Sequence, residues 1–191
     1  ASRGLGDVYK RQKKSSKNLE LKLNFLFEDE HLIVLNKPAG ILTHCTKDNT
    51  NTSIVDLLKA NKITLYKAEE SLRDGIVHRL DKDTSGLIVV AKNKLSYKGL
   101  INIFSRREVT KVYEAFCWGV PIPIAGIINK PLTDYINRKK ISLNTYGKQA
   151  ITEYKVKKNY DNYFSFLECK ILTGRTHQIR VHMKSENCPL I

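Results

Sequence analysis

The chain of 191 residues lacks several patterns that define whole classes of protein. No apolar run approaches the roughly 20 residues of a membrane span, and no signal-peptide core is present. The cysteines lie far apart without a C-x-x-C pair, which argues against a zinc cluster or a disulfide framework. We therefore expect reduced thiols in a cytoplasmic protein, at Cys45, Cys117, Cys169 and Cys188.

Patterns for cofactors and metals are also missing. No glycine-rich loop has the spacing that cradles phosphates, and the segment KPAG at residues 37–40 lacks the glycine and lysine placement of a nucleotide loop. A metal site could be assembled from Asp81, Asp83, His78 and His177, but their spacing matches no known ligand pattern. His177 and His182 are five residues apart and do not share a helix face, so surface or phosphate contacts are expected of them. The sequence thus predicts neither a cofactor nor a metal.

Acidic residues are scarce relative to basic ones. There are 33 lysines and arginines against 19 aspartates and glutamates, which gives a formal charge of +14. Such an excess favours a polyanionic partner, either nucleic acid or an anionic membrane surface. Because no membrane segment is present, nucleic acid is the better candidate.

The two ends of the chain look unlike the rest. Residues 1–12 resemble a translated sequencing adapter; they carry Arg3, Lys10 and Arg11 against Asp7, so without them the charge falls from +14 to +12. Residues 13–18 form a short basic leader. Residues 19–191 are expected to form one domain, and the protein is expected to be a monomer. The whole chain has 41% hydrophobic residues, as is usual for a globular protein. The chain stops at Ile191 without a turn or cap, and we expect this domain to be incomplete at its C-terminus.

Hydrophobic periodicity predicts an α+β fold, a single domain with a mixed, mainly antiparallel sheet flanked by a few helices. Strands are expected at residues 31–36, 76–80, 86–92, 111–119, 150–158 and 163–172, the last two as a hairpin. Helices are expected from an N-cap at residues 52–53 to about residue 61, at residues 93–107 and at residues 173–184. A turn at residues 37–40 and an exposed basic hairpin at residues 137–140 complete the prediction.

Asp81 lies in the polar turn between the expected strands 76–80 and 86–92. A carboxylate there could be a nucleophile or general base, kept ionised by Arg175 or Arg180. It could equally accept backbone N–H groups as a structural Asx turn, and Asp83 competes with it for any role. Tyr113 could be an ordinary sheet aromatic or a platform for an extruded base. The residues alone leave these alternatives open.

Two motifs indicate a family. Residues 77–92, VHRLDKDTSGLIVVAK, and residues 172–183, LTGRTHQIRVHM, closely resemble the RluA-type pseudouridine synthases, most of all the members that modify large-subunit ribosomal RNA. Two weaker elements agree, residues 36–40 and residues 111–113. The resemblance runs from about Leu23 to the last residue.

The resemblance implies an isomerase that converts uridine to pseudouridine in RNA without a cofactor. In that case Asp81 would be the essential carboxylate, Tyr113 would pack against the uracil, Arg180 would pair with Asp81, Arg79 would enter the RNA, and Ile179 would assist substrate binding. Large-subunit ribosomal RNA is the expected substrate and transfer RNA the alternative. A non-catalytic RNA-binding module and a nucleoside glycosidase are the competing functions; the glycosidase needs a second acid that the sequence does not identify.

Overall fold

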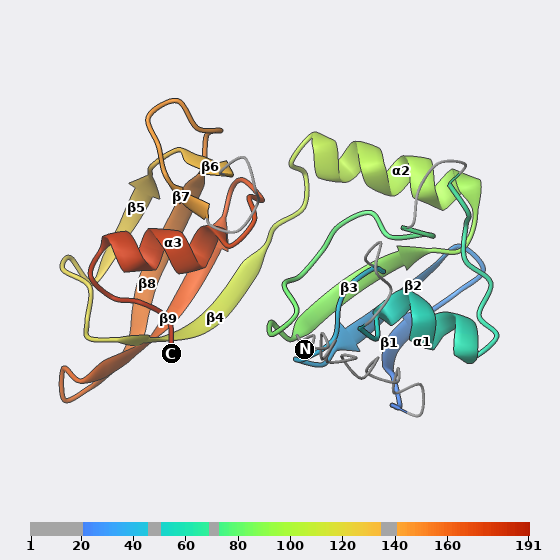
Figure 1. Cartoon of the computed structure of the whole chain (residues 1–191), viewed down its shortest axis with the longest axis horizontal. Coiled ribbons are helices and arrows are strands. Elements are labelled where there is room, and N and C mark those ends of the chain that lie inside the picture. Colours follow the sequence, from blue (N-terminus) through green and yellow to red (C-terminus); the bar gives the residue numbers. More distant parts are fainter. Residues whose placement is uncertain (1–20, 46–50, 69–72, 135–140) are drawn as a thin grey trace, which may run out of the picture. The chain divides into compact units, whose positions relative to one another are not determined.

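The computed structural model describes residues 21–45, 51–68, 73–134 and 141–191. Both expected leaders, residues 1–12 and 13–18, and the basic segment 137–140 lie outside these ranges. The chain divides into two compact units, residues 1–100 and 101–191. The described residues form antiparallel sheets of three, four and two strands together with three helices (Figure 1), which confirms the α+β class with antiparallel pairing. None of the helices in the described ranges has the length and apolar character needed to cross a membrane.

The first unit contains a three-stranded sheet in the order β1-β2-β3. Its strands are β1 (Asn24–Glu28), β2 (Leu32–Lys37) and β3 (Gly86–Ala91), so the strands expected at residues 31–36 and 86–92 are confirmed. The strand expected at residues 76–80 is wrong, because only Ile76 forms an isolated bridge, to Val90. The His78 ring, at Nε2, accepts the Val89 N–H at 2.9 Å, so a side chain takes a bond that a strand backbone would have taken.

Helix α1 (Ile54–Ala60) begins as the sequence predicts. Ser53 Oγ accepts the Asp56 N–H at 3.2 Å, and the Asp56 carboxylate accepts the Ser53 N–H at 3.0 Å. This reciprocal capping box satisfies two N–H groups that a helix start leaves unpaired. The apolar side chains of α1 are buried, and together with those of β2 and β3 they form the core of the first unit: Ile33, Leu35, Ile54, Val55, Leu57, Leu58, Ile88 and Val90.

Helix α2 (Lys94–Ser105) confirms the helix expected at residues 93–107. Asn93 Oδ1 caps it by accepting the Ser96 N–H at 3.0 Å. Its apolar side is only partly buried, and the ring of Tyr97 packs against that of Tyr66 in a tilted arrangement, with ring centroids 4.9 Å apart and an interplanar angle of 43°.

The second unit contains a four-stranded sheet in the order β4-β9-β8-β5. These strands are β4 (Val112–Trp118), β5 (Ala125–Asn129), β8 (Ile151–Tyr160) and β9 (Phe164–Ile171), and a separate pair is formed by β6 (Leu132–Asp134) and β7 (Ile141–Leu143). The predicted hairpin is confirmed as β8 and β9, which turn through Asp161 and Asn162 at positive φ. The alternation predicted for β4 is also confirmed, since Cys117 is buried while Phe116 and Trp118 are exposed.

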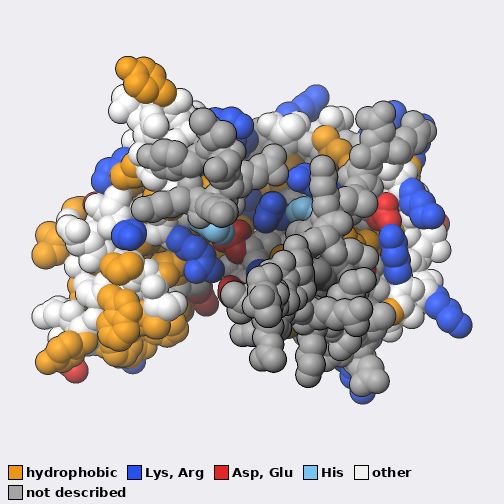
Figure 2. Space-filling view, in the orientation of Figure 1, with side chains coloured by type: hydrophobic (Ala, Val, Ile, Leu, Met, Phe, Trp, Pro, Cys, Tyr) orange, Lys and Arg blue, Asp and Glu red, His pale blue; other side chains and the backbone are white. Residues whose placement is uncertain are grey.

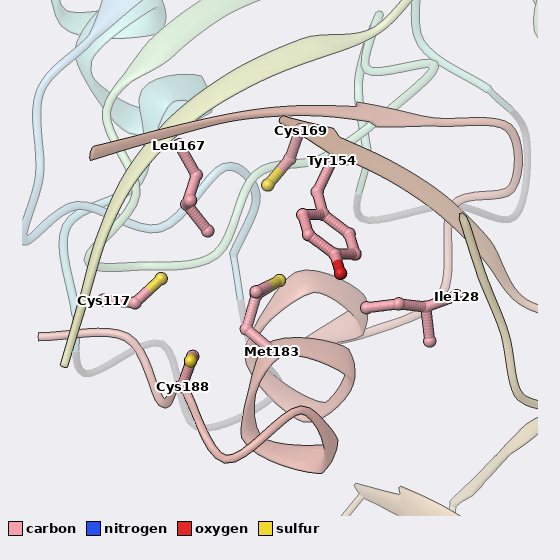
Figure 3. Close-up of a cluster of buried hydrophobic side chains, with 7 residues drawn as sticks. All are labelled: Cys117, Ile128, Tyr154, Leu167, Cys169, Met183 and Cys188. Carbon is pink, nitrogen blue, oxygen red and sulfur yellow. The ribbon is translucent and has the colours of Figure 1, made fainter. Parts of the chain in front are cut away.

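Helix α3 (Gln178–Ser185) contributes Met183 to the buried core of the second unit. Figure 3 shows this core, in which the side chains of three cysteines and of Met183 lie together with those of Leu167, Tyr154 and Ile128. The helix begins five residues later than the expected start at Thr173, because residues 173–177 form a turn that ends at His177 with φ +53°. We call the remaining segment, residues 173–177, the α3 entry turn.

Candidate functional site

The loop that carries Asp81 is anchored by a buried lysine in the first unit. The Lys37 side chain is fully buried, and its ammonium donates to the carbonyl oxygens of Pro38 at 2.9 Å, Ile41 at 2.8 Å and Lys82 at 3.0 Å. The Gly40 N–H donates to the same Lys82 oxygen at 2.9 Å. The turn predicted at residues 37–40 therefore holds the residue that follows Asp81.

A threonine holds the residue that precedes Asp81. Thr43 Oγ1 donates to the Leu80 carbonyl at 2.8 Å and accepts the Leu80 N–H at 3.1 Å, and both residues are buried. The Thr84 N–H donates to the Asp81 carbonyl at 3.1 Å and closes the turn. The backbone is thus fixed on both sides of Asp81, whose own side chain is half-buried, while Arg79 is exposed.

Charges near the loop act on Lys37. Burial lowers the pKa of Lys37 to about 8, and the carboxylates of Asp83 and Asp81 act in the opposite direction. At neutral pH this lysine is still mostly an ammonium, so the first unit supplies a cation of its own to these carboxylates. Lys37 was missed by reasoning from residue types, because a lysine in a turn is normally exposed.

His44 lies close to the two arginines of the same region. Burial, followed by the charges of Arg73 and Arg79, lowers the pKa of His44 to about 4. Its Nδ1 atom is buried and has no hydrogen-bond partner among the described residues. His44 is therefore a neutral imidazole at physiological pH. One of the charges that act on it is that of Arg79, the residue predicted to enter the RNA.

The second unit carries the other expected site residues. Tyr113 on β4 and Ile179 on α3 are partly buried and pack against the same core cluster, whereas Arg180 is exposed on α3. The structure thus brings Tyr113 and Ile179 to the border of one cluster. Asp81 belongs to the first unit and Arg180 to the second, so their pairing stays a prediction. Arg175, the other candidate cation, donates from Nε to the Gln149 carbonyl at 3.0 Å.

His182 does not lie on the surface, and the expectation of a surface or phosphate contact is wrong for it. The side chain is fully buried, with Nδ1 2.9 Å from Thr152 Oγ1 and Nε2 2.9 Å from the Lys130 carbonyl. Burial lowers the pKa of His182. Both partners are distant in sequence, so no local pattern indicates this burial.

The described residues contain no group of three or more His, Cys, Asp or Glu side chains that could hold a metal ion. All four cysteines are free thiols. Burial raises the pKa of Cys117 to about 11 and that of Cys169 to about 12, so both thiols stay protonated and unreactive at neutral pH.

Comparison with known proteins identifies the family of this chain. A family model described as RNA pseudouridylate synthase matches residues 31–185. The chain therefore belongs to the RNA pseudouridylate synthase family.

Individual relatives agree with this assignment. The chain is 43% identical over 172 residues to the ribosomal large subunit pseudouridine synthase D of Borreliella burgdorferi, covering 87% of this chain and 52% of the relative. It is 38% identical over 169 residues to the uncharacterized RNA pseudouridine synthase YlyB of Bacillus subtilis, covering 88% and 55%. The solved structure of human RNA pseudouridylate synthase domain containing 4 matches with a TM-score of 0.70 and 27% identity, covering 87% of this chain and 66% of that one. The chain spans about half the length of the curated relatives it matches.

Proposed function

We propose that this protein isomerises specific uridines to pseudouridine in structured RNA, with large-subunit ribosomal RNA as the substrate class. Six of the relatives carry the name ribosomal large subunit pseudouridine synthase D, at 36% to 43% identity. The observation that carries the proposal is the fixed loop around Asp81, since Lys37 and Thr43 hold the backbone on either side of it. Such a substrate is consistent with a cytoplasmic site of action.

The reaction makes modest demands on the protein. The bond between uracil N1 and ribose C1′ breaks, the uracil turns, and C5 bonds to C1′ while the C5 proton is lost and N1 gains one. Nothing is oxidised or reduced. A carboxylate held in one position can serve as the nucleophile or as the base, because fixed geometry removes much of the entropy cost of either step.

Substrate binding requires the uridine to leave the RNA stack, at a cost of a few kcal/mol. Exposed Arg79 is proposed to enter the space that the base vacates, and Tyr113 with Ile179 to contact the extruded uracil. The formal charge of +14 favours contacts with RNA phosphates, and lysine and arginine side chains are spread over the face shown in Figure 2. Arg180 is proposed to orient the Asp81 carboxylate, as charge-assisted pairs do.

The decisive experiment measures tritium release from RNA labelled at uracil C5. Large-subunit ribosomal RNA and transfer RNA transcripts are offered separately to the protein and to its Asp81→Asn variant, which keeps the size of the side chain and removes the carboxylate. We expect release from ribosomal RNA and a loss of about 1,000-fold or more in Asp81→Asn, as is common when a nucleophile or base is removed. Asp83→Asn, two residues away and exposed, is the matched control and should remain within about threefold.

The outcomes separate the candidate functions. Release that is unaffected by Asp81→Asn removes Asp81 from the mechanism. Release from transfer RNA alone corrects the substrate class. RNA binding without release from either transcript favours a non-catalytic RNA-binding module, and free uracil among the products favours a glycosidase.

A further inference from the structure

Helix α3 is attached to the sheet by buried polar side chains in addition to the apolar core. Thr152 and His182 are fully buried, and Thr173 and Gln178 are each 3% exposed. Apolar side chains would pack a helix against a sheet without the desolvation cost that buried polar groups carry. A buried polar set is stable only if every member finds its partners, and then it fixes one arrangement of the groups.

The first half of this set fixes the α3 entry turn. Thr173 Oγ1 accepts the Ile151 N–H at 2.9 Å and donates to Gln178 Oε1 at 2.8 Å. Gln178 Oε1 also accepts the Arg175 N–H at 3.0 Å. The carbonyl oxygen of one glutamine thus holds both the side chain that opens the turn and the backbone within it.

The second half fixes the helix itself. The Gln178 amide donates to the Ile151 carbonyl at 2.9 Å and to Thr152 Oγ1 at 3.0 Å. A carbonyl can only accept, so the contact between His182 Nε2 and the Lys130 carbonyl requires the proton on Nε2. Nδ1 of the neutral ring is then an acceptor, and the Thr152 hydroxyl donates to it at 2.9 Å. The donor and the acceptor of each of these hydrogen bonds are therefore fixed. Thr152 accepts from Gln178 and donates to His182, and so links the two residues of the helix.

The position of these residues on the helix decides what they control. Gln178 and His182 are four residues apart and share one face of α3. Arg180 lies midway between them in sequence, about 200° around the helix from each, and so points away from the face that they attach. Rotation of α3 about its axis would move Arg180 and its neighbour Ile179, and the bonds to Thr152 oppose that rotation.

We propose that Thr152, Gln178 and His182 are positioning residues that fix the rotation of α3 and thereby the direction of Arg180 and the placement of Ile179 toward the substrate. This inference rests on the proposed function. It assigns no contact with RNA to the three residues themselves.

The test removes one hydroxyl without changing the volume of the side chain. Thr152→Val is expected to lower kcat for tritium release by about tenfold with KM for RNA within about twofold, because misplacement of an orienting group affects the chemical step more than the phosphate contacts. Thr152→Ser, which restores the hydroxyl, should recover kcat to within about twofold of the wild type. Ser165→Ala is the matched control: Ser165 is a buried hydroxyl of the same sheet that donates to the Gly119 carbonyl at 2.7 Å, and its loss should lower the melting temperature but not kcat.

A double-mutant cycle shows whether the effect passes through Arg180. In an Arg180→Lys background, which keeps a cation but not the rigid guanidinium, Thr152→Val should lower kcat by less than about threefold, while its effect on the melting temperature stays the same. If Thr152→Val does not fold, Thr173→Val removes the hydroxyl at the other end of Gln178 and should give the same pattern.

The inference is overturned if the folded variant keeps wild-type kcat, or if the loss of kcat is equal in the two Arg180 backgrounds. A kcat loss in Ser165→Ala of the same size also overturns it, because the effect would then follow stability alone. A wild-type protein that releases no tritium overturns the proposed function, and this inference with it, so the two failures are distinguishable.

Discussion

The loop beside Asp81 should depend on the hydroxyl of Thr43 more than on its methyl group. Thr43→Val keeps the shape of the side chain and removes the bonds to both backbone groups of buried Leu80, at 2.8 Å and 3.1 Å. Leaving a buried donor or acceptor unpaired costs about 1–3 kcal/mol for each group. Two unpaired groups therefore cost about 2–6 kcal/mol, and subtracting about 0.8 kcal/mol for the added apolar group leaves a predicted loss of roughly 1–5 kcal/mol in the free energy of unfolding.

Thr43→Ser is the matched control because it makes the opposite change. It keeps the hydroxyl and deletes one buried methyl, for an expected loss of about 1 kcal/mol. A site stabilised by packing alone would rank the two variants the other way, with valine close to the wild type. The order of the two variants is therefore more informative than either magnitude.

The assay must report on the first unit. The single tryptophan, Trp118, lies in the second unit, so urea unfolding should be followed by far-ultraviolet circular dichroism as well as by fluorescence. Tritium release measured on the same samples should fall further in Thr43→Val than in Thr43→Ser, since Leu80 adjoins Asp81. A valine variant as stable as the serine variant, or more stable, would refute the reasoning.

Local patterns were sufficient to predict many elements. The N-cap at the start of α1, the hairpin of β8 and β9, and the alternation along β4 all depend on neighbours within a few residues or on a period of two. These signals are local in the sequence, and the structure retains them.

The errors arise where a side chain competes with the backbone. Residues 76–80 have strand propensity, but the His78 ring takes the Val89 amide. The α3 entry turn precedes the helix, and there the side chain of Gln178 accepts the Arg175 N–H. This side-chain contact stabilises a turn at residues where the sequence predicts helix. Such competition is decided by partners that no periodicity reveals.

The residue pattern also did not predict the two side chains, Lys37 and Thr43, that anchor the loop around Asp81. Lys37 reaches Lys82, 45 residues away, and Thr43 reaches Leu80, 37 residues away. The chemistry of Asp81 stayed open from residue types alone, and only resemblance to a family gave it a role. The segment at residues 36–40, noted as a weak match to that family, was the one signal that pointed toward Lys37.

Two further predictions concern the first unit. As pH falls from about 6.5 to about 4, the unfolded chain binds a proton at His44 that the folded protein, with a pKa of about 4 there, does not bind. This group should therefore lower the free energy of unfolding by up to about 3 kcal/mol over that pH range, as measured by urea unfolding. In His44→Gln the free energy of unfolding should depend less steeply on pH, and an equal pH dependence in the two proteins would contradict the assignment. Gly75 and Gly40 both have positive φ, +67° and +84°, but a methyl group on Gly75 would overlap the carbonyl oxygen of Ala91, whereas one on Gly40 meets nothing within 4 Å. Gly40→Ala should cost about 1–2 kcal/mol from the backbone conformation alone. Gly75→Ala carries the same conformational cost and must also displace β3, whose Ala91 N–H donates to the Gly75 carbonyl at 2.9 Å. The free energy of unfolding should therefore fall by at least about 2 kcal/mol more in Gly75→Ala than in Gly40→Ala. If urea unfolding gave the same loss of free energy for both variants, β3 would be able to move away from a methyl group at Gly75 without loss of stability, and the prediction would be wrong.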